Sequence, residues 1–351
     1  MTEDRVVCFV TDPQDKSKLE EMFVALGSGP IEIIDMALPR PLLRLLALGR
    51  PRGRQPLKIV RLAWWSRAMR QSDVIVAVER TSVLLKKLGR KGPPMVHIPH
   101  GAGDRARGYD RRIRHFDHVF AAGPKDSERF IQYGLARPEQ ISVTGYIKRS
   151  GLQKIFKEKP IFFDNNKPTI LYNPHFSKSL SSWFEQGKEI ISTVVSTDRF
   201  NLIFAPHVRL FENASPSERA EIEALARPGS VHIDLGSPRS IDMSYTLAAD
   251  LYLGDVSSQV YEFCAQPRPC VFVNAHGVSW KGDPHYAMWH FGEVVEKIDG
   301  LVSALDGASQ VHATYEAVQR EAVEWSFGDS GVDAAQVAAA RLIEIADGWR
   351  H

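Results

Sequence analysis

Residues 240–263 read SIDMSYTLAADLYLGDVSSQVYEF, a pattern that predicts a helix, a strand, a tight turn and a second helix. Apolar residues recur at helical spacing in the first part, so this helix can lay an apolar face on a sheet. The apolar run 251–253 is long enough for a buried parallel strand, and Gly254 and Asp255 end it. The stretch therefore predicts an α/β fold with a parallel sheet.

The turn after this strand has the features of an anion-binding site. A helix that begins directly after a strand directs free backbone N–H groups, and the positive end of its dipole, at the crevice beyond the strand ends. Ser257 and Ser258 stand at this turn and add hydroxyl donors that suit a phosphate or a pyrophosphate. The alternative is that one of these serines only caps the helix.

Length and composition indicate a globular protein of two domains. The chain has 351 residues, of which 44% are apolar and 25% charged, and its net charge of +2 provides no global field for nucleic acid. Cys8, Cys264 and Cys270 lack metal-ligand spacing, so we expect reduced core thiols in a cytosolic protein. The charged N-terminus does not resemble a signal peptide, and no run of 18 apolar residues predicts a membrane span.

Two series of short apolar runs alternate with helical patterns, which predicts two Rossmann-like domains with parallel connections. In the first domain, residues 1–150, the predicted strands are 5–10, 31–34, 73–77, 95–98, 116–121 and 141–145. Residues 151–168 predict a linker. In the second domain, residues 169–328, the predicted strands are 169–172, 201–205, 231–233, 251–253 and 269–273. Residues 329–351 predict a C-terminal helix that is capped at Gly348.

Residues 36–72 contain nine cations and no acidic side chain. Leucines are interleaved with the cations, and Trp64 and Trp65 follow. Cationic segments rich in leucine and tryptophan can lie in the headgroup region of an anionic membrane, and this is the preferred interpretation. The alternatives are a solvated basic loop with a core helix behind it and, least favoured, a patch for nucleic acid.

Three histidines follow predicted strands at their carboxyl ends. His100 follows the strand 95–98 and precedes a glycine-rich turn, while His175 and His207 follow two strands of the second domain. Parallel α/β folds place their chemistry at this edge of the sheet, and histidine can take a proton from an alcohol near neutral pH. A structural histidine that caps a turn is the alternative for each.

A loop after the strand 269–273 is rich in aromatic and cationic side chains. Its residues lack the tight spacing of a zinc site, but they could line an aromatic and cationic pocket. They are His276, Trp280, Lys281, His285, Trp289 and His290.

Four segments resemble motifs of the CDP-glycerol glycerophosphotransferase family, of the teichoic-acid polymerase and primase type. Residues 99–101 (PHG) resemble its His-Gly motif, and residues 144–149 (TGYIKR) resemble its Gly-Tyr-Pro-Arg segment. The strand ends 169–174 and 205–207 resemble its paired strand-end motifs. Residues 249–263 (ADLYLGDVSSQVYEF) resemble its aDxxItDYSSxxfe signature, and the order of all four matches.

The resemblance implies the GT-B architecture, in which two Rossmann-like domains with parallel sheets face a central cleft. It implies a transferase that moves a glycerol-phosphate-type group from a CDP-activated donor to a hydroxyl of a glycan or lipid-linked acceptor, in the synthesis of a cell-envelope polymer or glycolipid. The implied catalytic residues are His100, as the base, and His207, which stabilises phosphate charge. The implied donor-binding residues are Gly101, Gly145, Lys148, Arg149, Pro174, His175, Arg209, Asp255, Ser257, Ser258 and Glu262.

Two other functions stay open on the same residues. A GT-B glycosyltransferase would hold the diphosphate of a nucleotide sugar at the same helix start, and a non-catalytic GT-B-like protein would only bind a lipid or glycan. We expect no essential metal and no resident cofactor, because GT-B enzymes stabilise the leaving group with helix dipoles and side chains. The expected partners are a CDP-alcohol or nucleotide-sugar donor, the acceptor, and an anionic membrane, with no nucleic acid. The expected location is the cytoplasm, at the inner face of the cell membrane.

Overall fold

The computed structural model describes residues 6–10, 31–35, 55–78, 80–87, 92–99, 109–149 and 159–350. The chain divides into two compact units. The first unit comprises residues 1–151 together with 325–351, and the second comprises residues 152–324. The end of the chain therefore belongs to the same unit as its beginning.

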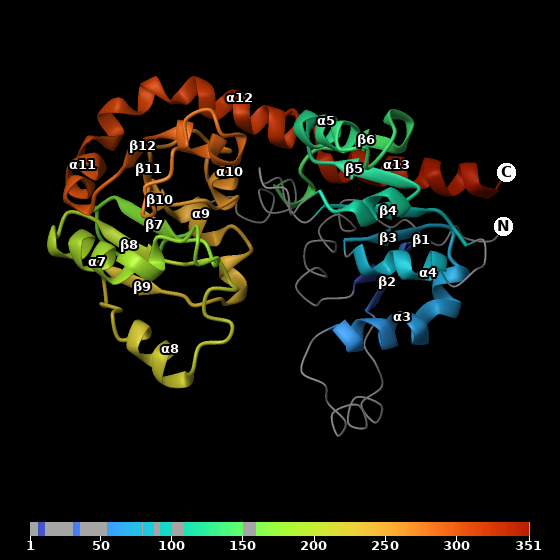
Figure 1. The fold of residues 1–351 in the computed structure, drawn as a ribbon, viewed down its shortest axis with the longest axis horizontal. Coiled ribbons are helices and arrows are strands. Elements are labelled where there is room, and N and C mark those ends of the chain that lie inside the picture. Colours follow the sequence, from blue (N-terminus) through green and yellow to red (C-terminus); the bar gives the residue numbers. More distant parts are fainter. Residues whose placement is uncertain are drawn as a thin grey trace. The chain divides into compact units, whose positions relative to one another are not determined.

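The first unit contains a six-stranded parallel sheet with the strand order β2-β1-β3-β4-β5-β6 (Figure 1). The chain passes from β1 to β2 on one side and then to β3 on the other side of β1, so the direction of winding reverses between β1 and β3. The strands are β1 (Val6–Val10), β2 (Ile31–Asp35), β3 (Ile75–Ala77), β4 (Met95–His97), β5 (His118–Ala121) and β6 (Ile141–Val143).

Helices cover both faces of this sheet. On one face, Val76 and Val96 pack against small and apolar side chains of the last helix, such as Ala338 and Leu342. On the other face, alternate strand residues pack against α3 and α5, because successive side chains of a strand point to opposite sides. The helices of this unit are α3 (Gln55–Arg70), α4 (Leu84–Lys87), α5 (Pro124–Gln132) and α13 (Ala334–Arg350).

The returning end of the chain packs closely on the turn after β6. Tyr146 donates its backbone N–H to the carbonyl of Phe327 at 3.1 Å, and the two aromatic rings stack with their centroids 4.3 Å apart. Gly145 has φ of +88°, and a Cβ at this position would lie 2.7 Å from the Cβ of Ala334. Glycine is required there both by the backbone conformation and by the start of α13.

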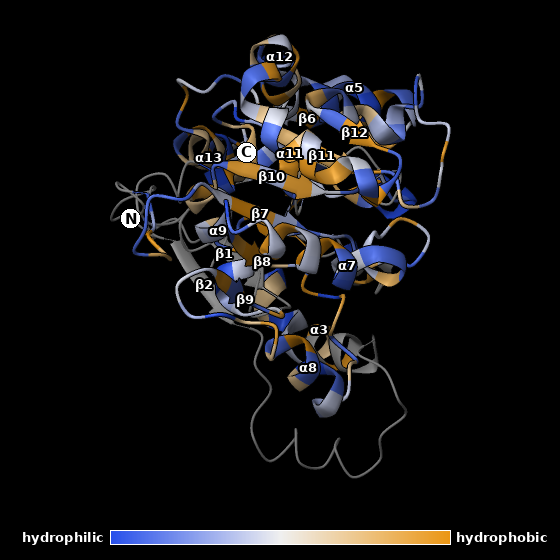
Figure 2. Ribbon diagram, turned by 90° about the vertical axis from the view of Figure 1, so that its left-hand side faces the viewer, coloured by the Kyte–Doolittle hydropathy of each residue, from blue (hydrophilic) through white to orange (hydrophobic). Residues whose placement is uncertain are grey.

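The second unit contains another six-stranded parallel sheet, with the order β12-β11-β10-β7-β8-β9. The reversal here lies between β7 and β10, which are paired side by side. Figure 2 shows that β7, β8 and β10 are hydrophobic, as expected of strands that are covered on both faces. The strands are β7 (Thr169–Asn173), β8 (Asn201–Phe204), β9 (Val231–Ile233), β10 (Leu251–Gly254), β11 (Cys270–Val273) and β12 (Glu293–Val295).

Helices also flank the second sheet. On one face, α7 and α11 contribute to a core with Ile170, Leu202 and Leu253. α12 begins in the second unit and ends in the first, so the unit boundary at residue 324 falls within a continuous helix. The helices are α7 (Trp183–Ser196), α8 (Pro216–Glu223), α9 (Ser244–Ala248), α10 (Gln259–Phe263), α11 (Leu301–Val311) and α12 (Glu316–Phe327).

The predicted fold class is confirmed, and each predicted strand is present within two residues at either end. The edge strand β12 was not predicted, because it has three residues and begins with a charged one. The predicted cap at Gly348 is wrong, since α13 continues to Arg350. Cys264 and Cys270 are free and buried, as predicted, whereas the side chain of Cys8 lies outside the described residues. Among the described helices, none combines the length and apolar character needed to cross a membrane.

Candidate functional site

The loops that follow β7 and β10 meet where the strand order of the second unit reverses. Open α/β sheets bind ligands outside the carboxyl ends of their strands at such a reversal. The residues at this position come from the segments that the sequence singled out. We call Asn173, His175, His207, Arg209, Asp255 and Ser257 the switch-point site.

Asn173, the last residue of β7, joins three strand ends. Its Nδ2 donates to the carbonyl of Ala205 at 2.6 Å, after β8. Its Oδ1 accepts a hydrogen bond from Ser257 at 2.7 Å and a longer one from Tyr252 at 3.3 Å. Sequence reasoning did not assign this residue to the site, although an asparagine directly after an apolar strand was the available signal.

Asp255 holds the loop after β7 against the turn after β10. One carboxylate oxygen accepts the backbone N–H of His175 at 2.9 Å, and the other accepts both the backbone N–H of Ser182, at 2.6 Å, and its hydroxyl, at 2.9 Å. Burial raises the pKa of Asp255 to about 6, and these hydrogen bonds oppose the rise. The buried carboxylate therefore fixes the two loops against each other.

The two serines of the turn have different environments. Ser257 is buried, and its hydroxyl donates to Asn173. Its hydrogen is thus used within the protein, and the role of Ser257 as a phosphate donor stays a prediction. Ser258 is exposed at the start of α10 and makes no side-chain cap. Because α10 has only five residues, its dipole is weaker than that of a longer helix and attracts an anion less strongly.

His175 and His207 occupy equivalent turns at neighbouring strand ends. In each turn, Nδ1 of the ring accepts the backbone N–H two residues ahead, from Ser177 at 2.9 Å and from Arg209 at 3.1 Å. A backbone N–H can only donate, so the hydrogen of each neutral ring lies on Nε2. The two turns are joined by a backbone hydrogen bond, in which the backbone N–H of His207 donates to the carbonyl of Pro174 at 3.0 Å. The centroids of the two imidazole rings are 5.7 Å apart.

The surroundings of His207 favour an uncharged ring beside a permanent cation. Burial, together with the charge of Arg209, lowers the pKa of His207 to about 4. The guanidinium of Arg209 lies 4.2 Å from the centre of the Phe176 ring, and Phe176 in turn packs against both histidines. The arrangement offers the Nε2–H donor of the neutral His207 ring and the exposed guanidinium of Arg209, which lies 3.9 Å from Glu212, and both groups suit a phosphate.

The remaining predicted residues of the second unit lie close to this site in the chain. Pro174 and Glu262 are buried. Glu262 lies on α10, where the neighbouring Gln259 donates from its side chain to the carbonyl of Ser240 at 2.8 Å. This contact ties the start of α10 to the segment before α9.

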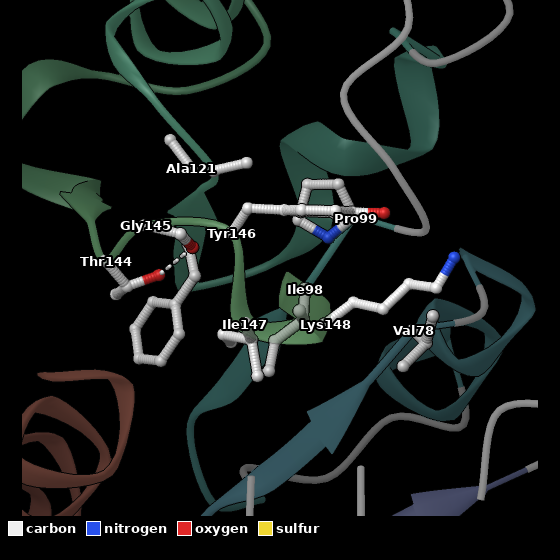
Figure 3. A pocket seen from close by; sticks show the side chains of 11 residues that line it. Val78, Ile98, Pro99, Ala121, Thr144, Gly145, Tyr146, Ile147 and Lys148 are labelled. Atoms are coloured by element: carbon white, nitrogen blue, oxygen red, sulfur yellow. Dashed lines mark hydrogen bonds between the residues drawn. The ribbon is translucent and has the colours of Figure 1, made fainter. Parts of the chain in front are cut away.

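Four predicted donor-binding residues belong to the first unit, and three of them are among the described residues. Gly145 and Lys148 line a pocket at the carboxyl ends of β3–β6, together with Val78, Pro99 and Tyr146 (Figure 3). In this view the Lys148 side chain extends along the pocket, and its ammonium lies at the end away from Thr144. Arg149 follows, and burial lowers the pKa of its guanidinium.

His100 and Gly101 lie outside the described residues, directly after Pro99 of this pocket. The assignment of His100 as a base therefore stays a prediction, as does the predicted central cleft. Within the described ranges, no cluster of three or more His, Cys, Asp or Glu side chains could hold a metal ion.

Comparison with known proteins identifies the fold. No protein-family model matches the sequence, and no curated protein matches it either. The structure is similar to that of the wall teichoic acid polymerase TagF soaked with CDPG, with 15% identity, a TM-score of 0.63, and coverage of 98% of this chain and 90% of the other. It is also similar to Staphylococcus aureus MnaA with UDP, with 12% identity, a TM-score of 0.64, and coverage of 97% and 95%.

A third similar structure is the UDP-GlcNAc 2-epimerase of Neisseria meningitidis bound to UDP-GlcNAc. It has 14% identity and a TM-score of 0.64, and the match covers 97% of this chain and 100% of the other. At these identities the likeness establishes the fold, which is the GT-B fold of two Rossmann-like units. The neighbours with this fold include both a polymerase and epimerases.

Proposed function

We propose that the protein is a GT-B transferase that uses a nucleotide-activated donor, and that this donor is a CDP-alcohol of the CDP-glycerol type. The observation that carries the proposal is the switch-point site, where the Nε2–H donor of His207 and the guanidinium of Arg209 stand at the carboxyl edge of a parallel sheet, beside its reversal. The sequence resemblance at 249–263 and the likeness to a structure soaked with CDPG support the same donor.

The proposed reaction is a displacement at phosphorus. An acceptor hydroxyl forms a new O–P bond to the glycerol-bearing phosphorus, the bond from this phosphorus to the bridging oxygen breaks, and CMP leaves with the electron pair. The hydroxyl proton goes to a base, for which His100 is the candidate. His207 and Arg209 stabilise the charge on the phosphates, and phosphoryl transfer depends mainly on such positioning and charge stabilisation.

Product release distinguishes this donor from a nucleotide sugar, which is the second candidate because two similar structures contain UDP or UDP-GlcNAc. The purified protein is incubated with CDP-glycerol or with UDP-GlcNAc, with and without a crude glycolipid acceptor. We expect CMP from CDP-glycerol and no UDP from UDP-GlcNAc. Release of UDP from UDP-GlcNAc, without CMP from CDP-glycerol, overturns the CDP-alcohol proposal and favours a glycosyltransferase. Binding of both nucleotides without product indicates the non-catalytic alternative.

Arg209→Ala connects this activity to the site. The variant should weaken the binding of CMP about tenfold, since a hydrogen bond to a charged group contributes about 1.5–3 kcal/mol. Arg199→Ala is the matched control, because both side chains are about half exposed, at 57% for Arg209 and 51% for Arg199, and each pairs with a carboxylate, Arg209 with Glu212 and Arg199 with Asp306. Equal CMP affinity in both variants would place the phosphates elsewhere.

We also propose that the protein docks on an anionic membrane through α3, which supports a lipid-linked acceptor. α3 has no acidic residue, and Trp64, which is 55% exposed, lies on one flank with Arg67 and Arg70. Trp65 instead packs against the core. Residues 36–54 of the basic stretch lie outside the described residues.

A further inference from the structure

The loop that connects β11 to β12, residues 274–292, carries aromatic side chains that the proposed reaction does not use. Trp280 is half-buried, and its ring stands nearly perpendicular to Trp289, with their centroids 5.7 Å apart. His290 contacts the same Trp280 ring at 5.0 Å, and Tyr286 packs on Trp289 at 4.8 Å. We call residues 274–292 the aromatic loop.

Two hydrogen bonds attach the aromatic loop to the switch-point site. Trp289 is buried, and its Nε1 donates to the backbone carbonyl of Asp255 at 2.8 Å. Nε2 of His276 lies 3.1 Å from the carbonyl of Ser181, which precedes the serine held by Asp255. Since β7, β10 and β11 are parallel, their following loops share one edge of the sheet. The loop is therefore held beside the turns that carry the proposed phosphate donors.

Exposed polar side chains of the aromatic loop, those of Lys281 and His290, contact the ring of the half-buried Trp280. Lys281, His285 and His290 are exposed. The ammonium of Lys281 lies 5.9 Å from the centre of the Trp280 ring, near the outer limit of a cation–π contact, so a ligand can displace it at little cost. An aromatic face bordered by hydrogen-bonding side chains matches a pyranose ring, whose C–H face is apolar and whose edge carries hydroxyls.

We propose that Trp280 and Lys281 form a subsite for a pyranose ring of the substrate, with the ring against Trp280 and its hydroxyls toward Lys281. A three-carbon glycerol unit has no ring face to stack on Trp280, so the subsite selects cyclic from acyclic groups. With the proposed CDP-alcohol donor the ring belongs to a glycan acceptor, and with the second candidate donor it is the sugar of a nucleotide sugar. The inference rests on the proposed binding of the nucleotide at the switch-point site.

Calorimetric titrations of the full chain test the subsite and its two sources. The donor arm compares the affinity for UDP-GlcNAc with that for UDP. The acceptor arm compares the affinity for chitobiose with that for glycerol, and both of its titrations are made in the presence of saturating CMP. Wild-type protein is compared with Trp280→Ala, with Trp280→Phe, which keeps a ring face, and with Trp349→Ala, which changes an exposed tryptophan of the first unit.

In one of the two arms, we expect the wild type to bind the ligand with a pyranose ring more tightly than the ligand without one. Trp280→Ala should lower the affinity for the ring-bearing ligand about tenfold, and Trp280→Phe should lower it less. Trp349→Ala should bind as the wild type does. The affinities for UDP and CMP should be the same in every variant as in the wild type. This result would show that the substitutions leave the fold of the loop and the nucleotide site intact. The proposal is overturned if the wild type shows no ring-dependent binding in either arm, or if Trp280→Ala leaves it unchanged. Loss of nucleotide binding by the wild type itself would instead overturn the proposed function.

Discussion

His207 is held in the folded protein as a neutral ring, and this has a consequence for stability. Its pKa is lowered to about 4 by burial and by Arg209, whereas an unfolded histidine titrates near pH 6.5. Between these values the unfolded chain binds more protons than the folded one, so the free energy of unfolding falls as the pH is lowered through this window.

We predict that His207→Gln, which cannot take up this proton, removes part of the acid sensitivity. The melting temperature of the wild type should fall more steeply than that of His207→Gln between about pH 6.5 and pH 4.5. His115→Gln, at an exposed position in the first unit, serves as the control and should keep the wild-type slope. Parallel curves for the wild type and His207→Gln would show that this ring titrates normally.

Alanine substitutions at Ser257 and Ser258 should differ in their effect on the stability of the second unit. Ser257→Ala leaves the buried Oδ1 of Asn173 without its 2.7 Å donor, so we expect it to destabilise the second unit by about 1–3 kcal/mol. Ser258→Ala removes an exposed hydroxyl and should leave stability unchanged. Chemical denaturation of the two variants measures the difference. If Ser257→Ala is as stable as the wild type and binds CMP more weakly, the hydroxyl serves the ligand and not the strand ends.

At the scale of elements, the turn after β6 and the start of α13 constrain each other. Gly145→Ala introduces a Cβ that lies 2.7 Å from the Cβ of Ala334 in a backbone with positive φ. Gly134→Ala is a matched control, because its φ is also positive, at +59°, but nothing lies within 4 Å of the added Cβ. Backbone strain should lower the free energy of unfolding of both variants by about 1 kcal/mol. In Gly145→Ala the clash should lower it by about 1–3 kcal/mol more.

Hydrogen exchange in β5 reports this loss, because its buried amides open mainly with the first unit. Exchange should be faster in Gly145→Ala than in Gly134→Ala. Equal rates in the two variants would mean that α13 moves away from the turn without cost.

The α3 helix carries the prediction for the membrane. Each cation near an anionic surface contributes about 1 kcal/mol, and a tryptophan adds burial at the headgroups. Arg67→Glu with Arg70→Glu should therefore lower co-sedimentation with vesicles of phosphatidylcholine and phosphatidylglycerol by at least about thirtyfold at low salt. Arg137→Glu with Arg320→Glu changes the net charge equally at exposed positions elsewhere and should bind as the wild type does. Binding to neutral phosphatidylcholine vesicles, or no binding by the wild type, would contradict the docking surface.

The elements also show what the sequence could predict. Apolar runs such as 169–172 and 201–205 mark buried parallel strands, because both faces of such strands are covered, and the histidines after them could be placed at the carboxyl edge. The role of Ser257 could not be predicted, since its partner Asn173 is distant in the sequence and close only through strand pairing. The packing of α13 on the first sheet likewise joins residues distant in the sequence, such as Val76 and Leu342.

At the scale of the whole molecule, the chain has two units with separate cores, and the proposed phosphate site belongs to only one of them. A ligand that binds the folded state stabilises it by about 2.7 kcal/mol at a free concentration of 100 times its dissociation constant. If the units open independently, this stabilisation reaches only the unit that holds the ligand.

We predict that CMP slows hydrogen exchange in β7, β8 and β10 of the second unit and leaves β3, β4 and β5 of the first unit unchanged. The amides at these strand centres are buried and exchange mainly when their unit unfolds, so their rates measure the stability of each unit separately. Arg209→Ala should need about tenfold more CMP for the same protection, and Arg199→Ala should not. Slowing in both units alike would show that they unfold together or share the nucleotide, and slowing confined to β3, β4 and β5 would place the nucleotide in the pocket beside Lys148 instead.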